Sequence, residues 1–136
     1  MGSEEGPGAT QESYTEFLNA LEATGMRVTK DRFETGAYLL QKKQEDAMVT
    51  IRIGLNDYSG ADMVITNMTT LPDDMKGQGY GSTVVQELIT AATAQGMKDI
   101  RAVQVQKLSQ TFWEKNGFVK APEPNNTNDF LYQGIL

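Results

Sequence analysis

The segment of this chain best suited to bind an anion runs from Lys76 to Ser82 and reads KGQGYGS. Its three glycines, Gly77, Gly79 and Gly81, permit a positive φ and carry no side chain that would keep a ligand away from the backbone. An apolar-faced helix is predicted directly after them, and the free N–H groups of a helix's first turn attract negative charge. Since Lys76 adds a positive charge, the segment predicts a phosphate or pyrophosphate site.

Two familiar phosphate-binding loops do not match this segment. The G-x-x-x-x-G-K-[ST] spacing is absent, because Lys76 precedes the glycines. A dinucleotide-binding fold is disfavoured, because the glycines are spaced G-x-G-x-G and the strands predicted before them form a meander. On these residues alone, a flexible glycine-rich loop that binds nothing is the remaining alternative.

The chain contains no cysteine and no histidine. This composition excludes disulfides, thiol nucleophiles, imidazole acid–base catalysis and the usual zinc sites, so we expect no metal. Any chemistry must therefore use carboxylates, hydroxyls, lysines, backbone groups or a bound cofactor.

Charge and hydropathy exclude further classes of protein. The chain has 12 basic and 18 acidic residues, with 13 of the acids and 6 of the bases in residues 1–74. An acidic total argues against nucleic acid as a partner, because affinity for phosphate backbones comes largely from basic side chains. No apolar stretch approaches the ~20 residues that cross a bilayer, and the N-terminus does not resemble a signal peptide. We expect a cytoplasmic protein without a membrane partner.

A length of 136 residues predicts one domain. Residues 1–12 are rich in glycine and acids and are expected to form a disordered leader, with the domain spanning 13–136. A first helix is predicted from Ser13, which forms an S-x-x-E capping box with Glu16, to Gly25.

The rest of the chain alternates between the strand period of two and the helix period of 3.6 residues, except for residues 26–35, which give no clear signal. A hairpin and a third strand are predicted first, then a helix, a strand, a short helix and two final strands. In order they cover Tyr38–Gln41, Met48–Leu55, Ala61–Thr70, Tyr80–Gln95, Asp99–Val105, Leu108–Asn116, Phe118–Lys120 and Phe130–Ile135. This order predicts an α/β (α+β) domain in which a strand–helix–strand unit continues an antiparallel meander.

Two motifs taken together resemble one protein family. KGQGYGS is followed about 30 residues later by TFWEKNGF, Thr111 to Phe118. The pair resembles the [QR]-x-x-G-x-[GA] motif and the F-Y-E-K-x-G-F segment of the GCN5-related N-acetyltransferase (GNAT) family, over roughly residues 61–120. The resemblance implies a mixed, mostly antiparallel central sheet flanked by helices. The N-terminal part is expected to be reduced, because family members generally begin with a strand and two helices.

The resemblance also implies acetyl-CoA as acyl donor. Lys76 falls where the family has Gln or Arg, and the following backbone amides would hold the pyrophosphate. The end of the third strand matches the segment that pairs with the pantetheine arm. The residues that the resemblance assigns to the cofactor are Met68, Thr69, Thr70, Lys76, Gly77, Gln78, Gly79, Tyr80, Gly81, Ser82, Gln106 and Trp113.

The family's reaction is direct attack by a primary amine on the thioester in a ternary complex, which implies an N-acetyltransferase. Trp113 stands where the family often has an acidic tyrosine, and an indole N–H cannot titrate, so the acid role is either vacant or filled by another hydroxyl such as that of Ser109 or Tyr80. Asp62, near the start of the third strand, is the candidate base; the alternative is a solvated carboxylate beside a turn.

The acceptor would be an amine on a small molecule or a protein, and the acidic first half favours a cationic one. The rival hypothesis is a CoA-binding or structural protein on the same fold with little or no transferase activity. The sequence leaves the oligomeric state open, and a homodimer is one alternative.

Overall fold

The computed structural model describes residues 10–56, 60–72, 79–122 and 128–133. The rest of the predicted leader, residues 1–9, and the motif residues Lys76, Gly77 and Gln78 lie outside the described residues. The elements are α1 (Gln11–Ala23), β1 (Arg27–Lys30), β2 (Ala37–Gln44), β3 (Ala47–Leu55), β4 (Met63–Leu71), α2 (Tyr80–Ala94), β5 (Ile100–Ala102), the 3₁₀ turn η3 (Lys107–Ser109), α3 (Gln110–Lys115), β6 (Phe118–Lys120) and β7 (Phe130–Tyr132).

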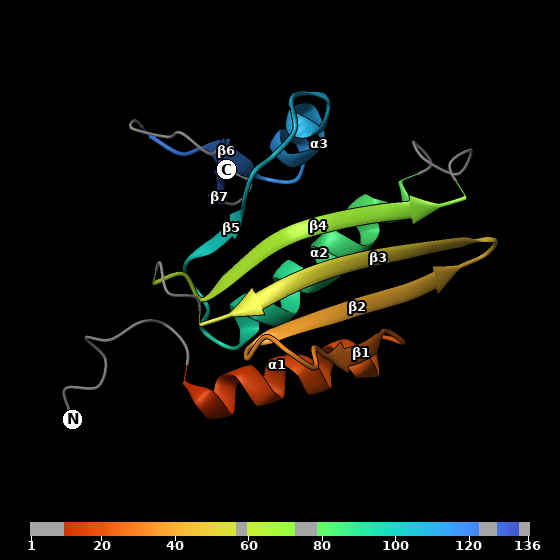
Figure 1. Cartoon of the computed structure of the whole chain (residues 1–136), viewed down its shortest axis with the longest axis vertical. Coiled ribbons are helices and arrows are strands. Elements are labelled where there is room, and N and C mark those ends of the chain that lie inside the picture. The colour runs from red at the N-terminus through yellow and green to blue at the C-terminus, as the bar shows by residue number, and fades with distance from the viewer. Residues whose placement is uncertain (1–9, 57–59, 73–78, 123–127, 134–136) are drawn as a thin grey trace.

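The strands form one sheet in the order β1-β2-β3-β4-β5-β7-β6 (Figure 1). Neighbouring strands are antiparallel except β4 and β5, which are parallel and are connected through α2. The predicted α/β class, with a mostly antiparallel sheet flanked by helices, is confirmed.

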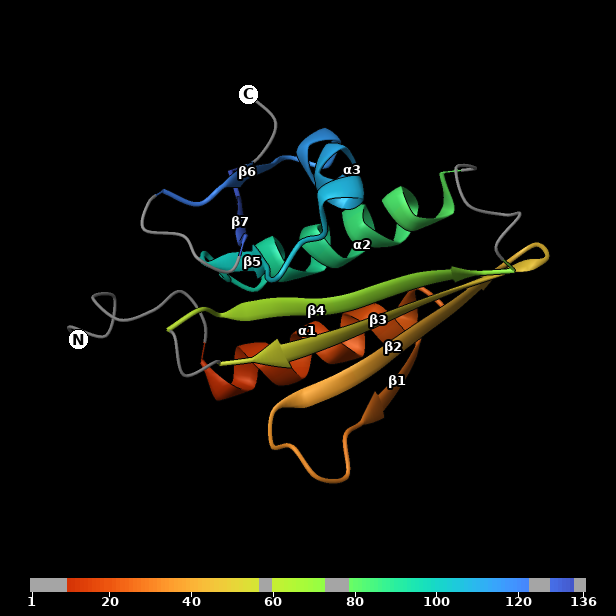
Figure 2. The ribbon, with the colours of Figure 1, turned by 45° about the horizontal axis from the view of Figure 1, so that its top comes forward.

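The core lies between one face of the sheet and the helices. Every second residue of β3 is buried, from Ala47 to Leu55, as its apolar alternation predicts. Phe17 and Leu21 of α1 and Leu88 of α2 belong to the same buried cluster. Figure 2 shows α1 and α2 on the same side of strands β1 to β4. The sheet therefore buries one face against helices.

The first helix begins earlier than its capping box predicts. Its N-cap is Thr10, whose hydroxyl oxygen accepts a hydrogen bond from the Ser13 backbone N–H at 3.1 Å. Gln11 and Glu12 are helical, so the predicted boundary of the leader at residue 12 is wrong. The reason is that Thr10 has an extended backbone, and its side chain accepts a hydrogen bond from an N–H of the first turn. Thr10 therefore caps the helix three residues before Ser13 would have done so.

Among the strands whose bounds differ from the prediction, β1 and β5 do so for local reasons. β1, which gave no signal, pairs with β2 at the edge of the sheet and is mostly exposed, so its side chains do not alternate in polarity. β5 ends at Ala102 and not at Val105, because the chain turns at Gln104, which has a φ of +54°. That early end separates β5 from β4.

The connection from β1 to β2, residues 31–36, contains no helix and is held by Arg52 of β3. The Arg52 guanidinium contacts the carboxylates of Asp31 at 2.7 Å and Glu34 at 2.8 Å. The hydrogen bond from Arg52, with those from the backbone N–H groups of Glu34 and Phe33, lowers the pKa of Asp31 to about 2. Since this pKa is depressed, the stabilisation is present above pH ~4 and is lost as the pH falls toward 2.

The described residues contain neither a membrane-spanning helix nor a cluster of metal-ligating side chains. Every described helix is too short or too polar to cross a lipid bilayer. Within the same residues, no three Asp or Glu side chains are grouped so that they could hold a metal ion.

Candidate functional site

The parallel strands β4 and β5 separate part-way along their length and leave a cleft. They pair from Met63 and Ile100 to Ile65 and Ala102, and the Val103 N–H then donates to the Ile65 carbonyl at 3.0 Å. Figure 1 shows β5 turning away from β4 toward α3. The cleft has a volume of about 390 Å³ and is lined by residues 65–69 of β4, residues 102–106, and Ser109, Phe112 and Trp113.

A β-bulge in β4 lies at the point where the cleft opens. Arg52 of β3 is paired with Asn67 and Ile53 with Ile65, so Thr66 is the extra residue. A bulge leaves one residue out of the ladder and re-aims its neighbours. Beyond Ile65, no described strand pairs with the edge of β4 that faces the cleft. Backbone groups of Thr66 to Thr69 are therefore placed to bind an extended ligand.

The N-terminus of α2 provides a second set of backbone groups. Gly79 is its N-cap and has a φ of +87°, in the left-handed region that favours glycine. The first turn carries no acidic residue, and no described group accepts a hydrogen bond from the N–H of Tyr80, Gly81 or Ser82. Free N–H groups at the positive end of a helix dipole suit an anionic oxygen.

The terminus of α2 meets the side chains that line the cleft at Gly81. A Cβ placed on Gly81 would lie 3.3 Å from the Met68 Cε and 3.5 Å from the Phe112 Cε1. The helix terminus therefore packs directly against Met68 of β4 and Phe112 of α3, which both line the cleft. A single ligand with an anionic group at the terminus of α2 and an extended arm in the cleft would fit this arrangement.

Helix α3 forms the far wall and is fixed to α2 by a buried asparagine. The Asn116 amide nitrogen donates to the Ser82 hydroxyl at 3.2 Å and to the Phe112 carbonyl at 2.8 Å, and its oxygen accepts from Gln86 at 3.0 Å. Asn116 is 3% exposed, so each of these bonds is shielded from water. This connection sets the width of the cleft beside the terminus of α2.

Comparison with known proteins gives the fold a name. No protein-family model and no curated protein matches the chain. Among solved structures, the chain is similar to an acetyltransferase from Thermus thermophilus, with a TM-score of 0.52 and 20% identity over 70% of this chain. The chain has the GNAT fold. A second similar structure, PH1933 from Pyrococcus horikoshii, has a TM-score of 0.51 and 17% identity over 74% of this chain. The chain spans 61% and 66% of the lengths of these two proteins.

Most of the residues predicted to contact a cofactor on the GNAT fold are brought together. Met68, Thr69, Gln106 and Trp113 line the cleft, as does the candidate acid Ser109. Gly79, Tyr80, Gly81 and Ser82 form the terminus of α2 beside it. Thr70 is buried and is absent from the lining of the cleft. Lys76, Gly77 and Gln78 are outside the described residues, so their predicted contacts stay predictions.

The candidate base Asp62 lies elsewhere. It is 2% exposed and precedes β4, at the opposite end of the strand from Thr69. Its carboxylate accepts hydrogen bonds from the Tyr14 hydroxyl at 3.2 Å and from the backbone N–H groups of Lys98 and Asp99 at 2.7 and 3.1 Å. Burial and then the charge of Asp62 raise the pKa of Tyr14 to about 12. The structure thus gives Asp62 a structural position and does not support the base hypothesis.

The alternative acid Tyr80 also points away from the cleft. Its hydroxyl donates to Glu45 at the tip of the β2–β3 hairpin, at 3.2 Å. Burial and this hydrogen bond raise the pKa of Tyr80. Of the two hydroxyl groups that the sequence offers as acids, that of Tyr80 lies outside the cleft, whereas Ser109 lines it.

Sequence reasoning missed three parts of the site. Thr66 gave no sign of a bulge, because a bulge depends on the partner strand. Asn116 stands at the variable position of F-Y-E-K-x-G-F, so the motif predicts no role for it. Phe112 is not among the residues predicted to contact the cofactor, yet it lines the cleft. The glycine at position 81, which its ring faces, is the signal that could have indicated it.

Proposed function

We propose that this chain transfers an acetyl group from acetyl-CoA to a primary amine by direct attack in a ternary complex. The observation that carries the proposal is the junction at Gly81, where the N-terminus of α2 packs against side chains of the cleft, beside the edge of β4 that no described strand pairs with. Acetyl-CoA has a pyrophosphate that would bind at the N-terminus of α2 and an extended, amide-containing arm that would lie along the edge of β4. The residues present therefore fit this cofactor.

In this proposal the bound cofactor supplies an activated thioester, and the protein holds that thioester in position for attack by the amine. The N–H groups at the start of α2 hold the pyrophosphate, and the free edge of β4 aligns the arm. Backbone donors beside Thr66 stabilise the negative charge that develops on the carbonyl oxygen. These backbone donors are already oriented before the reaction, so little free energy is spent on reorienting them as the charge develops.

Proton transfer in this proposal depends on water more than on side chains. The described lining of the cleft contains no Asp, Glu or Lys, and Asp62 is buried elsewhere. The amine proton would leave to water, and Ser109 or water would protonate the departing sulfur. A thiol has a reference pKa of ~8.5, so the sulfur can leave as a thiolate and take up its proton afterwards, with slower turnover than when a strong acid protonates it during departure.

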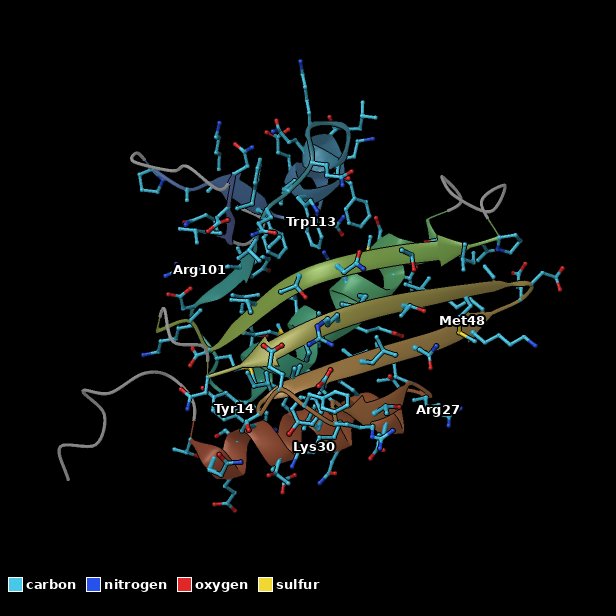
Figure 3. All side chains as sticks on the ribbon, in the orientation of Figure 1. Tyr14, Arg27, Lys30, Met48, Arg101 and Trp113 are labelled. Carbon is cyan, nitrogen blue, oxygen red and sulfur yellow. The ribbon has the colours of Figure 1, made fainter. Side chains whose placement is uncertain are left out.

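The proposed acceptor side lies at the β1–β2 connection. A cavity of about 590 Å³ there is lined by residues of α1, β1, β2, the connection itself and the end of β3, including Tyr14, Lys30, Glu34 and Tyr38. Figure 3 shows Tyr14 and Lys30 near this end of the sheet. Arg52 links the two regions, because it holds Glu34 and is paired in register with Asn67 of the cleft. An amine on a small molecule or a protein is the proposed acceptor.

The first experiment measures binding and turnover separately. At 100 times its Kd, CoA is expected to raise the melting temperature by about 10 °C, because a ligand of the folded state stabilises it. Thiol release from acetyl-CoA is then followed with a polyamine, a lysine peptide and a free peptide N-terminus. No shift of the melting temperature would overturn the proposal. Binding without turnover on any amine would favour the rival hypothesis, a CoA-binding or structural protein, which the lack of a titrating acid in the described lining of the cleft supports.

Arg52→Met provides a prediction on the acceptor side. Loss of both ion pairs releases the connection, and the KM for the amine is expected to rise about tenfold while the Kd for CoA stays within about twofold. Lys42→Met is the matched control, because it removes an ion pair with Glu87 on the helix side of the sheet. Equal effects of the two variants on KM would contradict this placement of the acceptor.

A further inference from the structure

The ring of Trp113 is held rigidly at the wall of the cleft. It makes edge-on contacts with Phe112, with ring centroids 5.1 Å apart, and with Phe118, at 5.0 Å. The side chain is 6% exposed and is labelled in Figure 3 between α3 and β4. Edge-on aromatic pairs favour one orientation of the ring. Trp113 is therefore a fixed feature of the cleft.

The indole N–H of Trp113 has no hydrogen-bond acceptor among the described residues. None of the hydrogen bonds found there involves it, although every buried side-chain nitrogen or oxygen in the same residues has a partner. The indole nitrogen consequently reaches accessible surface. Trp113 lines the β4–β5 cleft, so this N–H is a candidate donor to a ligand bound there.

We propose that the Trp113 indole N–H donates a hydrogen bond to the sulfur of the acyl donor and stabilises it as a thiolate without giving up its proton. The inference rests on the proposed function. As the amine nitrogen bonds to the carbonyl carbon, the carbon–sulfur bond breaks and its electron pair stays on the sulfur. The amine proton goes to water, and the indole keeps its own.

This role suits tryptophan better than the other group in the cleft. The Ser109 hydroxyl can rotate between partners, whereas the indole N–H has one direction set by the ring. A donor that does not titrate provides the same stabilisation at every pH. Trp113 thus replaces proton donation by a permanent hydrogen bond.

The chain's single tryptophan makes the proposal directly measurable. Its indole N–H gives one nuclear magnetic resonance signal in the full-length protein. With CoA bound, this signal is expected to shift, and its position should follow the titration of the bound thiol. Desulfo-CoA, which lacks the sulfur, should shift the signal without that titration. CoA that binds and leaves the indole signal unaffected by thiol ionisation would overturn the inference and leave the proposed function standing; absence of CoA binding would overturn both.

A pair of variants tests the same donor by a second route. The pKa of the bound CoA thiol, read from thiolate absorbance, is expected to lie about one pH unit below its free value. Trp113→Phe keeps an aromatic ring without the N–H and should return the pKa to the free value. Tyr132→Phe is the matched control, because it also removes a donor from a ring of the same aromatic cluster, outside the described lining of the cleft, and it should leave the lowered pKa unchanged. Ser109→Ala removes the other candidate donor of the cleft. The opposite pattern, with the serine variant raising the pKa and the tryptophan variant not, would assign the donor to Ser109 and overturn the inference.

Discussion

Gly79→Val is expected to abolish CoA binding while the domain stays folded. Gly79 has a φ of +87°, and a side chain there costs about 1–2 kcal/mol because the left-handed region crowds Cβ. Among the described residues, no atom lies within 4 Å of the added Cβ, so the core is not disturbed. The helix can relieve the strain only by turning its first N–H groups away from their present directions. Calorimetry with CoA should therefore show an affinity at least ~100-fold lower, a loss of about 3 kcal/mol.

Gly25→Val is the control for this prediction. Gly25 follows α1 and has a φ of +98°, and no atom of a described residue lies within 4 Å of an added Cβ there either. The two substitutions should lower the melting temperature by similar amounts, because they carry the same backbone strain. Only the change at Gly79 should affect CoA. Equal affinities in the two variants would place the anion site elsewhere and would remove the basis of the transferase proposal.

The regular elements could be predicted because their residues alternate strongly. The apolar side chains of β3 recur with a period of two, and those of α2 with the helical period, and both elements appear within a residue or two of the predicted bounds. Gly25, predicted to end the first helix, follows α1 and adopts a φ of +98°. Local sequence determines these features, since each is satisfied within one element.

The parts that were missed depend on contacts between distant segments. β1 is an exposed edge strand, and its residues show no alternation of apolar and polar side chains. Its extended conformation depends on pairing with β2. The bulge at Thr66 exists because β3 has one residue fewer over the same length. Asp62 was interpreted as a base from its place near a strand, yet its amide partners lie 36 and 37 residues further along the chain. A single sequence contains no local signal for such partners.

The structural position of Asp62 predicts that two substitutions there will have opposite outcomes. Asp62→Ala leaves the Tyr14 hydroxyl and the Lys98 and Asp99 N–H groups without their acceptor in a buried place. The free energy of unfolding should fall by about 2–4 kcal/mol and the melting temperature by about 10 °C. Asp62→Asn keeps an oxygen for the two N–H groups and can donate its amide to the Tyr14 oxygen, so most of the stability should remain.

The asparagine variant separates structure from catalysis, because it removes basicity and keeps the hydrogen bonds. If Asp62 accepted the amine proton, Asp62→Asn would lower kcat about 100-fold or more. The structure predicts a kcat within about twofold of the parent, measured as thiol release at saturating amine. Tyr14→Phe, which removes one hydrogen bond of the same group, should cost about 1 kcal/mol and should combine non-additively with Asp62→Ala, since both break the same contact. A large fall in kcat with unchanged stability in Asp62→Asn would restore the carboxylate as the base.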